Sequence, residues 1–262
     1  MSIGGMNVAA TGLNAYSQQL AVVGNNIANI NTTAFKENDI RFQDMLYATP
    51  TDPGKQNGLT TTGLGVQFGY GVGVASNPTL FKQGPLNPGQ ELDIAINGEG
   101  FFQVVDSNGN TFLTRLGSFQ PKGIGSSGPM NLQIAGDTFT LDPPIDLPGQ
   151  NAATTVSPMG VVQQGTFSGQ LQLVRVSNPD GLQQVGNLLF KETPASGALL
   201  TGTPGNEGFG TIADNTLEGS NVDVTSSFID LIGASQNFSL NSQAFVTSNE
   251  EVVRAIALVN QS

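Results

Sequence analysis

Each end of this chain carries an apolar seam with coiled-coil spacing, whereas the long middle of the chain carries none. Within residues 3–29 the seam positions alternate steps of three and four residues, which is the spacing of an a/d stripe. They are Ile3, Met6, Ala10, Leu13, Ser17, Leu20, Gly24 and Ile27. Within residues 224–259 the same spacing selects Phe228, Leu231, Ser235, Phe238, Ser242, Phe245, Asn249, Val252, Ile256 and Val259. Two helices patterned in this way can bury their seams against each other or against another copy of the chain.

Very little charge covers the outer faces of these two predicted helices. The first charged residue is Lys36, and the C-terminal helix carries only Asp230, Glu250, Glu251 and Arg254. Because a free surface normally keeps more charge, such helices are expected to pack against further helices in the core of a tube or filament. The residues expected to stabilise the polymer are Leu13, Leu20, Ile27, Leu231, Phe238, Phe245, Val252 and Val259. The alternative, that the helices close one globular domain, is disfavoured by the missing polar face of residues 1–35.

The middle of the chain shows the alternation of β-strands. Residues 91–96 alternate, and residues 100–105 and 111–115 flank an Asn108-Gly109 turn of the kind that closes hairpins. Further short strands are predicted at residues 138–141, 170–176 and 188–191. Strands of this length at near-regular spacing predict a sandwich or a partly open barrel rather than βαβ units.

The resulting fold class is α+β, with terminal helices forming a coiled-coil-like inner domain around a central, mainly-β domain. Residues 49–78 are rich in Gly and Thr and hold few apolar anchors, so they predict an extended linker. Asp223 is the expected N-cap of the last helix. The predicted division is 1–36 for the N-terminal helix, 37–80 for the linker or loop, 81–216 for the β domain and 217–262 for the C-terminal helix.

The residue types present exclude most catalytic and metal chemistry. The chain has no Cys and no His, which removes thiol nucleophiles, Ser-His-Asp relays and zinc sites built on thiolate or imidazole. The closest carboxylates are Glu91/Asp93, Asp142/Asp146 and Glu250/Glu251. No aromatic platform for a sugar accompanies them, since Trp is absent and Tyr occurs only three times. We therefore expect no catalytic site, no metal and no cofactor.

The charge balance and the N-terminal residues limit the partners. The net charge is −11, and the nine Lys and Arg residues are scattered singly. Nucleic acids and anionic membrane surfaces bind clustered cations, so neither is an expected partner. Near the N-terminus apolar residues alternate with Asn, Gln, Ser and Thr, which fits neither a signal peptide nor a membrane span. If the protein leaves the cytoplasm, we expect a route without a cleaved signal peptide.

Five short motifs, in order along nearly the whole chain, resemble those of one protein family. They are residues 24–36 (GNNIANINTTAFK), 42–47 (FQDMLY), 92–104 (LDIAINGEGFFQV), 114–119 (TRLGSF) and 218–223 (EGSNVD). Together they are similar to the bacterial flagellar basal-body rod and hook proteins, the axial proteins of the flagellum. Ala34 stands where Gly is more usual in that family. The run Ser235-Gln236-Asn237-Phe238 replaces its common Gln-Arg-x-Tyr, so the basic residue is absent here.

The resemblance implies a structural subunit of the rod that self-assembles into a helical tube and transmits torque to the hook. The chain is most similar to distal rod subunits, because hook proteins are longer. Implied partners are further copies of itself, neighbouring rod and hook proteins, and surrounding ring proteins. The implied location is the periplasm-spanning rod of the basal body, reached through type III export. The resemblance also adds Asn25, Asn26, Asn29 and Phe35 to the assembly interface.

Three other interpretations remain open. A hook or proximal rod subunit is the same class of protein at a different axial position. A secreted β-rich carbohydrate-binding or hydrolytic protein belongs to another class, and its activity should survive removal of both terminal helices. A free globular protein with helical ends predicts no concentration-dependent assembly.

Overall fold

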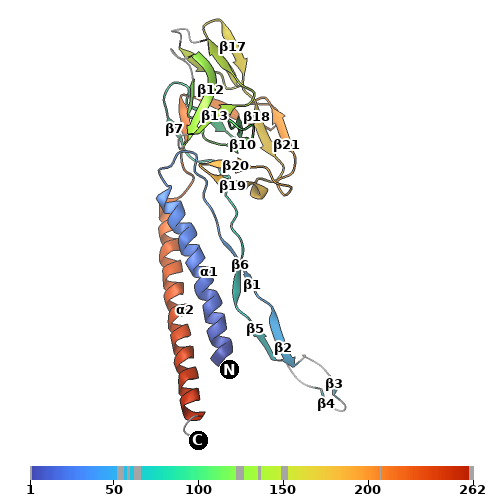
Figure 1. Cartoon of the computed structure of the whole chain (residues 1–262), viewed down its shortest axis with the longest axis vertical. Helices are drawn as coiled ribbons and strands as arrows, with labels where there is room; N and C mark the ends of the chain where they lie inside the picture. Colours follow the sequence, from blue (N-terminus) through green and yellow to red (C-terminus); the bar gives the residue numbers. More distant parts are fainter. Residues whose placement is uncertain are drawn as a thin grey trace. The chain divides into compact units, whose positions relative to one another are not determined.

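The chain divides into two compact units in a computed structural model of residues 1–262 (Figure 1). The structure describes residues 2–51, 56–57, 60–61, 66–121, 127–134, 137–148, 153–206 and 208–259. The helical unit comprises Met1–Ala28, Asn38–Pro78 and Asp223–Ser262, and the β unit comprises Asn29–Glu37 and Thr79–Val222. One helix stands at each end and strands fill the middle, so the predicted α+β class is confirmed. The predicted divisions at residues 36, 80 and 216 follow element order rather than these contacts and stay a prediction.

Two long helices form the frame of the helical unit. They are α1, Ser2–Ala28, and α2, Val224–Val259. The helices lie side by side and run in opposite directions (Figure 1). A Cβ placed on Gly5 would lie 3.4 Å from Ser248 Oγ. A Cβ placed on Gly12, seven residues later, would lie 2.6 Å from Asn241 Oδ1, seven residues earlier on α2, so the pairing follows an antiparallel heptad.

The buried face of α1 is displaced by one residue from half of the predicted seam. Its buried residues are Ala9, Gly12, Ala15, Val23 and Asn26. The predicted seam residues Ala10, Ser17 and Gly24 are exposed instead. The other predicted half is half-buried where its side chains are described, at Met6, Leu13, Leu20 and Ile27.

The same displacement occurs on α2. Its buried seam residues are Ser227 and Ala234, and the half-buried ones are Leu231, Asn241, Phe245, Ser248 and Val252. The predicted seam members Phe228, Ser235, Asn249 and Ile256 are exposed. Two stripes with three–four spacing share the apolar half of the seam, and the sequence pattern alone does not choose between them. The stripe that contains small residues, such as Gly12 on α1 and Ala234 on α2, is the one that is buried, because small side chains let the two helix backbones approach closely.

An aspartate caps α2 at its start. The Ser226 backbone N–H donates to Asp223 Oδ1 at 2.7 Å, and the Ser227 N–H donates to the Asp223 carbonyl oxygen at 3.0 Å. A carboxylate oxygen at this position satisfies one of the amides that the first helical turn leaves unpaired. The N-cap predicted from the sequence is therefore confirmed.

The segment between α1 and the β unit forms an antiparallel ribbon. Its strands are β1, Arg41–Asp44; β2, Tyr47–Thr51; β3, Gln56–Asn57; β4, Thr60–Thr61; β5, Val66–Gly69; and β6, Val72–Ser76. Strand β1 pairs with β6, β2 with β5, and β3 with β4. The ribbon contacts α1 where the Val72 N–H donates to Thr11 Oγ1 at 3.3 Å, and where the Tyr16 and Phe42 ring centroids lie 5.8 Å apart. The extended segment predicted here thus pairs with itself.

The β unit is built on one large antiparallel sheet with smaller sheets beside it. Its strands are β7, Leu86–Pro88; β8, Ile94–Asn97; β9, Phe102–Val105; β10, Thr111–Thr114; β11, Phe119–Pro121; β12, Ser127–Ile134; β13, Asp137–Leu141; β14, Asp146–Pro148; β15, Thr154–Val156; β16, Val161–Gln164; β17, Phe167–Gln170; β18, Leu173–Val176; β19, Gln183–Gly186; β20, Leu189–Lys191; β21, Leu199–Gly202; β22, Thr211–Asp214; and β23, Thr216–Glu218. The large sheet has the order β11-β12-β13-β9-β10-β20-β19, and β14 pairs with β12. The smaller sheets are β15-β16-β17, β18-β21, β22-β8 and β23-β7. The predicted hairpin across Asn108-Gly109 is the β9–β10 pair.

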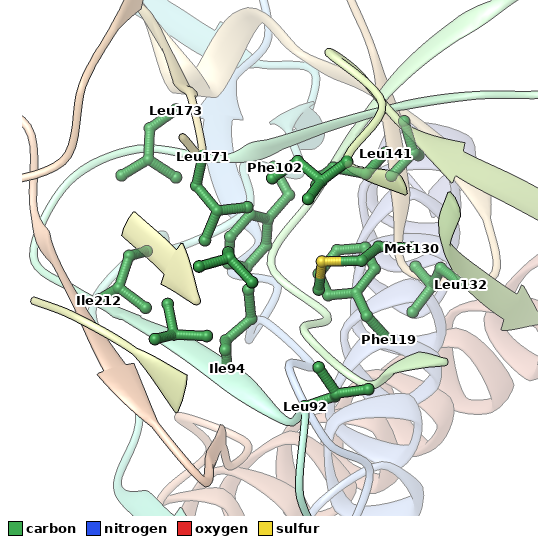
Figure 2. Close-up of a cluster of buried hydrophobic side chains, with 14 of the residues drawn as sticks. Leu92, Ile94, Phe102, Phe119, Met130, Leu132, Leu141, Leu171, Leu173 and Ile212 are labelled. Carbon is green, nitrogen blue, oxygen red and sulfur yellow. The ribbon is translucent and has the colours of Figure 1, made fainter. Parts of the chain in front are cut away.

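Apolar side chains from these strands form a main core (Figure 2) and a smaller second cluster around Phe101, Val174 and Phe190. The Phe102 and Phe119 rings meet edge to face with centroids 5.3 Å apart, a favoured aromatic geometry. Phe102 and Val104 alternate inward along β9, which is the period-two pattern expected of a strand with one buried face. The motif at residues 92–104 therefore supplies core packing.

The glycines of α1 allow a matched test of the helix pair. We expect Gly12→Leu to destabilise the helical unit by about 1–3 kcal/mol, because its side chain has to displace Asn241. Gly24→Leu is the control, since a Cβ on Gly24 meets nothing within 4 Å and leucine favours helix over glycine. Thermal melting followed by the helical circular dichroism signal measures both. Equal melting of the two variants would contradict the register described above.

Candidate assembly interface

Half of the residues predicted for the assembly interface lie half-buried on the two helices of one chain, and their role between copies stays a prediction. Leu13, Leu20, Ile27, Leu231, Phe245 and Val252 are all half-buried in the helical unit. Phe238 sits at the edge of the seam and stays 36% exposed. The side chain of Val259 lies outside the described part of the chain. These residues pack α1 against α2. If they also contact another copy of the chain, the same side chains serve both contacts.

A second apolar stripe runs along α2 on the flank of the seam, displaced from it by one residue, and its large side chains are exposed. Its large members are Phe228, Ile232, Val246, Val253 and Ile256. Each of these side chains is between 48% and 58% exposed. The positions between them in the same three–four series are Ser235, Ser239, Ser242 and Asn249. None of the charged residues of α2 falls in this series, which we call the outer stripe.

Sequence reasoning found only part of the outer stripe. The seam predicted from the sequence includes Phe228 and Ile256, whereas no predicted interface includes Ile232, Val246 or Val253. The available signal is a second three–four series that runs from Phe228 to Ile256. It overlaps the first series, so the two are separated only once the α1 contact is known.

The ribbon also exposes large apolar side chains. Leu46 is 85% exposed, and the exposed fractions of Tyr47, Phe68 and Tyr70 are 58%, 55% and 55%. Met45 belongs to the same group at 43%. A two-stranded ribbon has unpaired backbone groups on both edges as well as these side chains, which makes it a surface suited to another protein.

The asparagines of the N-terminal signature have separate structural roles. Asn26 is buried, its Nδ2 donates to the Asn38 carbonyl oxygen at 2.8 Å, and its Oδ1 accepts from the Asn38 N–H at 3.1 Å. The side chain thus pairs with backbone as a strand would, and fixes the return of the chain beside α1. Asn29 turns the chain after α1, since its carbonyl oxygen accepts from the Thr32 N–H at 3.0 Å. Asn25 is exposed.

A buried ion cluster lies where the chain enters and leaves the β unit. Lys36 Nζ lies 2.6 Å from Glu218 Oε1 and also donates to the Lys82 carbonyl oxygen at 2.8 Å. Arg115 Nη1 lies 3.5 Å from Glu218 Oε2, and its Nη2 donates to the Gly98 carbonyl oxygen at 2.9 Å. The side chains of Lys36 and Glu218 have no exposed area. One carboxylate therefore bridges two buried cations.

The entering and leaving segments are also tied by backbone hydrogen bonds and by hydrogen bonds of the Asn221 side chain to the backbone. The Ala34 N–H donates to the Glu218 carbonyl oxygen at 2.7 Å, and the Glu37 N–H donates to Asn221 Oδ1 at 2.7 Å. Asn221 Nδ2 donates to the Leu80 carbonyl oxygen at 2.7 Å. Ala34 has φ +59°, a region that favours glycine, which explains why Gly is more usual there. Phe35, predicted for the interface, is buried in this joint.

Sequence reasoning missed the ion cluster, although its signal is present. Lys36, Arg115 and Glu218 each lie in a different motif of the family resemblance, at residues 24–36, 114–119 and 218–223. Three motifs far apart in the sequence thus supply one charged residue each to one site. Burial lowers the pKa of Lys36 below its ordinary value of 10.5, although the neighbouring Glu218 carboxylate opposes the shift. Burial likewise lowers the pKa of Arg115, with Glu218 again opposing.

The described residues offer structural surfaces and no metal site. Among them, no three His, Cys, Asp or Glu residues gather in a way that could hold a metal ion. Neither helix, over the residues that the structure covers, is long and apolar enough to cross a membrane. The exposed apolar side chains of α2 and of the ribbon form surfaces that can bind another protein.

Comparison with known proteins identifies the family. Three family descriptions match in order: "Flagella basal body rod protein" at residues 6–36, "Flagellar hook protein FlgE/F/G D1 domain" at 95–164, and "Flagellar basal body rod FlgEFG protein C-terminal" at 213–256. The flagellar basal-body rod protein FlgG of Agrobacterium fabrum is 35% identical over 253 residues, covering 93% of this chain and 94% of that protein. FlgG of Caulobacter vibrioides is 34% identical over 255 residues, covering 94% and 95%. The chain belongs to the flagellar basal-body rod protein family.

The rod family matches this chain more completely than the hook proteins do. The hook protein FlgE of Escherichia coli is 32% identical over 179 residues, which is 68% of this chain but only 40% of that protein. The rod relatives match almost end to end, so the chain is a structural subunit of the flagellar rod, of the FlgG or distal rod type. The flagellum is accordingly its location, and assembly with rod and hook proteins is the shared property of the family.

The cluster of Lys36, Arg115 and Glu218 allows a direct test of what stabilises the place where the chain enters and leaves the β unit. We expect Glu218→Gln to destabilise the β unit by about 3–5 kcal/mol, because it leaves Lys36 and Arg115 buried without a counter-charge. Hydrogen exchange of the β9 and β10 amides measures the stability of the β unit. Tyrosine fluorescence would not report it, because all three tyrosines lie in the helical unit. Glu192→Gln, at an exposed position directly after β20, is the control and should change stability by less than about 0.5 kcal/mol. A similar effect of both variants would contradict the role of the cluster.

The deficit of Glu218→Gln should also depend on pH. Without Glu218 the pKa of Lys36 falls further, because the carboxylate is what opposes the lowering. A lysine with a lowered folded-state pKa destabilises fully below that pKa, and its penalty declines as the pH rises toward the unfolded value of 10.5. The deficit relative to the wild type should therefore shrink between neutral pH and pH 10.5. Hydrogen exchange, corrected for the intrinsic rate at each pH, tests this, and a constant deficit would show that Lys36 is not its cause.

Proposed function

We propose that this chain is a distal rod subunit that self-assembles into a helical tube, with α1 and α2 forming the inner wall. The observation that carries the proposal is the outer stripe of α2. Its five large apolar side chains are about half exposed, from 48% to 58%, and no charge lies in the series. A helix in a soluble monomer normally turns a charged face to water, so this stripe is suited to a neighbouring subunit.

The energy of the contact supports a lattice rather than a tight dimer. Burying the remaining half of each outer-stripe side chain is worth roughly 1 kcal/mol, because full burial of such residues is worth about 1.5–3 kcal/mol. Ser235, Ser239 and Ser242 lie between the apolar residues and permit a second helix to approach closely. Each contact is modest, and its repetition along a helical array makes the whole stiff.

The α1 helix is the complementary surface in this proposal. No residue of Ser2–Ala28 is charged, so a neighbouring α2 can cover it without burying an unpaired ion. Val8 of α1 is 39% exposed and offers an apolar contact to a neighbouring subunit. The exposed side chains of the ribbon, including Leu46 and Tyr47, supply further contacts with neighbouring subunits.

The remaining parts of the proposal follow from family membership. The tube would transmit torque to the hook within the periplasm-spanning rod, with ring proteins around it, after export as an unfolded chain. A hook or proximal rod position is the second candidate, although the partial match to a hook protein disfavours the hook. We propose no catalytic role, and the absence of Cys and His from the sequence supports this.

The outer stripe can be tested separately from the seam. We expect Ile232→Asp to prevent assembly while the α1–α2 pair stays intact, because Ile232 is 57% exposed and lies outside the buried seam. Phe245→Asp should lose both the helix pair and assembly, since Phe245 is half-buried in the seam. Gln243→Asp, at an exposed position outside both stripes, is the control. Light scattering and electron microscopy of concentrated protein measure assembly, and circular dichroism measures the helices.

Removal of the terminal helices decides between classes of function. A chain lacking residues 1–28 and 223–262 should remain monomeric at every concentration, whereas the full chain forms rods or tubes. Rods formed by Ile232→Asp as readily as by the wild type would contradict the assigned surface. A full chain that stays monodisperse under all conditions would contradict self-assembly itself.

A further inference from the structure

The β unit contains a cavity that no assembly contact described above uses. Its volume is about 330 Å³, and its lining includes two aromatic rings and three charged side chains: Phe81, Phe101, Arg115, Arg175 and Glu99. Strand β18 carries Arg175, and its neighbour Val174 pairs with Phe101 through backbone hydrogen bonds of 2.7 and 2.9 Å, which brings the two lining segments together. Gly100, with φ +133°, allows this approach, since a Cβ there would lie 3.3 Å from Leu173. The cavity is thus built by the main packing of the β unit.

The cavity has aromatic walls. The Phe81 and Phe101 rings meet edge to face with centroids 5.2 Å apart, and Phe190 stands behind both at 5.1 and 6.1 Å. The Arg115 guanidinium lies over the Phe101 ring, 5.3 Å from its centroid. Rings held in this way form a rigid apolar surface against which the methylene groups of a side chain can pack.

Positive charge exceeds negative charge around the cavity. Arg115 is only 4% exposed and shares its counter-ion Glu218 with Lys36, which lies closer to that carboxylate. Arg115 Nε is buried and has no hydrogen-bond partner among the described residues. Glu99 also acts on Arg115 and pairs with Arg175, so the three cations Lys36, Arg115 and Arg175 share two carboxylates, Glu218 and Glu99.

Arg175 is the cation at the mouth of the cavity. Its side chain is 35% exposed, and its Nη1 lies 3.7 Å from Glu99 Oε2, whose own side chain is 77% exposed. That pair is long and solvated, so it holds the guanidinium only weakly. The same Nη1 lies 3.4 Å from the Gly208 carbonyl oxygen, and the Phe209 ring lies 5.8 Å from the guanidinium carbon. The remaining N–H groups of Arg175 bond to none of the described residues, so they can receive an anion.

We propose that this cavity receives a carboxylate side chain from a second copy of the chain, with Arg175 as its main partner. The inference rests on the proposed self-assembly. The choice of occupant follows from charge complementarity, because the chain has 20 Asp and Glu against nine Lys and Arg. Copies that come together repel one another unless carboxylates meet cations, and Arg175 is a cation left accessible. The carboxylate bonds to Arg175 while its methylene groups pack on Phe81 and Phe101.

The test compares assembly of full-length variants that carry the same charge change. We expect Arg175→Glu to raise the critical concentration for assembly about tenfold, since it replaces an attraction with a repulsion. Lys191→Glu, at an exposed position of β20 in the same unit, should leave the critical concentration nearly unchanged. Arg175→Gln removes the charge without reversing it and serves if the reversal disturbs folding. Equal critical concentrations for Arg175→Gln and the wild type would overturn the proposal.

A second measurement needs no substitution. Phenylglyoxal modifies accessible arginines, and we expect Arg175 to be modified in the monomer and protected in the polymer. Equal modification in both states would overturn the proposal. Protection of the monomer by glutarate, without protection in the polymer, would assign the cavity to a free anion and also overturn it. Failure of the wild type to polymerise would instead overturn the proposed function, so the two failures are distinguishable.

Discussion

The structure depends on a close antiparallel contact between the two ends of the chain. That contact exists because small residues recur each heptad where the helices meet, with Gly12 against Asn241 and Gly5 against Ser248. Because α1 and α2 pair with each other, the chain between them leaves the helix pair after α1 and returns to it at α2. The ribbon and the β unit are therefore insertions into a two-helix frame, and the frame keeps an outer stripe on α2 available.

The sequence predicted the fold class and element types, because they depend on local periodicity. Both helices, the N-cap Asp223 and the β9–β10 hairpin are present where the spacing of apolar and turn residues placed them. The seam register was only half right, because two overlapping stripes satisfy the same spacing. Which stripe is buried depends on the small residues at the contact, such as Gly12, which faces Asn241 on the other helix, and that pairing joins residues far apart in the sequence.

The candidate site was less predictable for the same reason. Lys36, Arg115 and Glu218 are separated by scores of residues, and nothing local shows that one carboxylate bridges two cations. A single charged residue in a motif usually indicates a solvated surface, so burial could not be inferred from composition. The ribbon was expected as an extended segment, but its pairing depends on cross-strand register that Gly- and Thr-rich sequence specifies weakly.

The shared carboxylate has a mechanical consequence. The chain enters the β unit beside Lys36 and leaves it just after Glu218, and these two side chains are bonded at 2.6 Å. A pull applied to both connections is therefore met first by this bridge and by the backbone bonds around it, before it reaches the strands of the large sheet. Because Arg115 directly follows β10 and shares the same carboxylate, the cluster also links both connections to the large sheet.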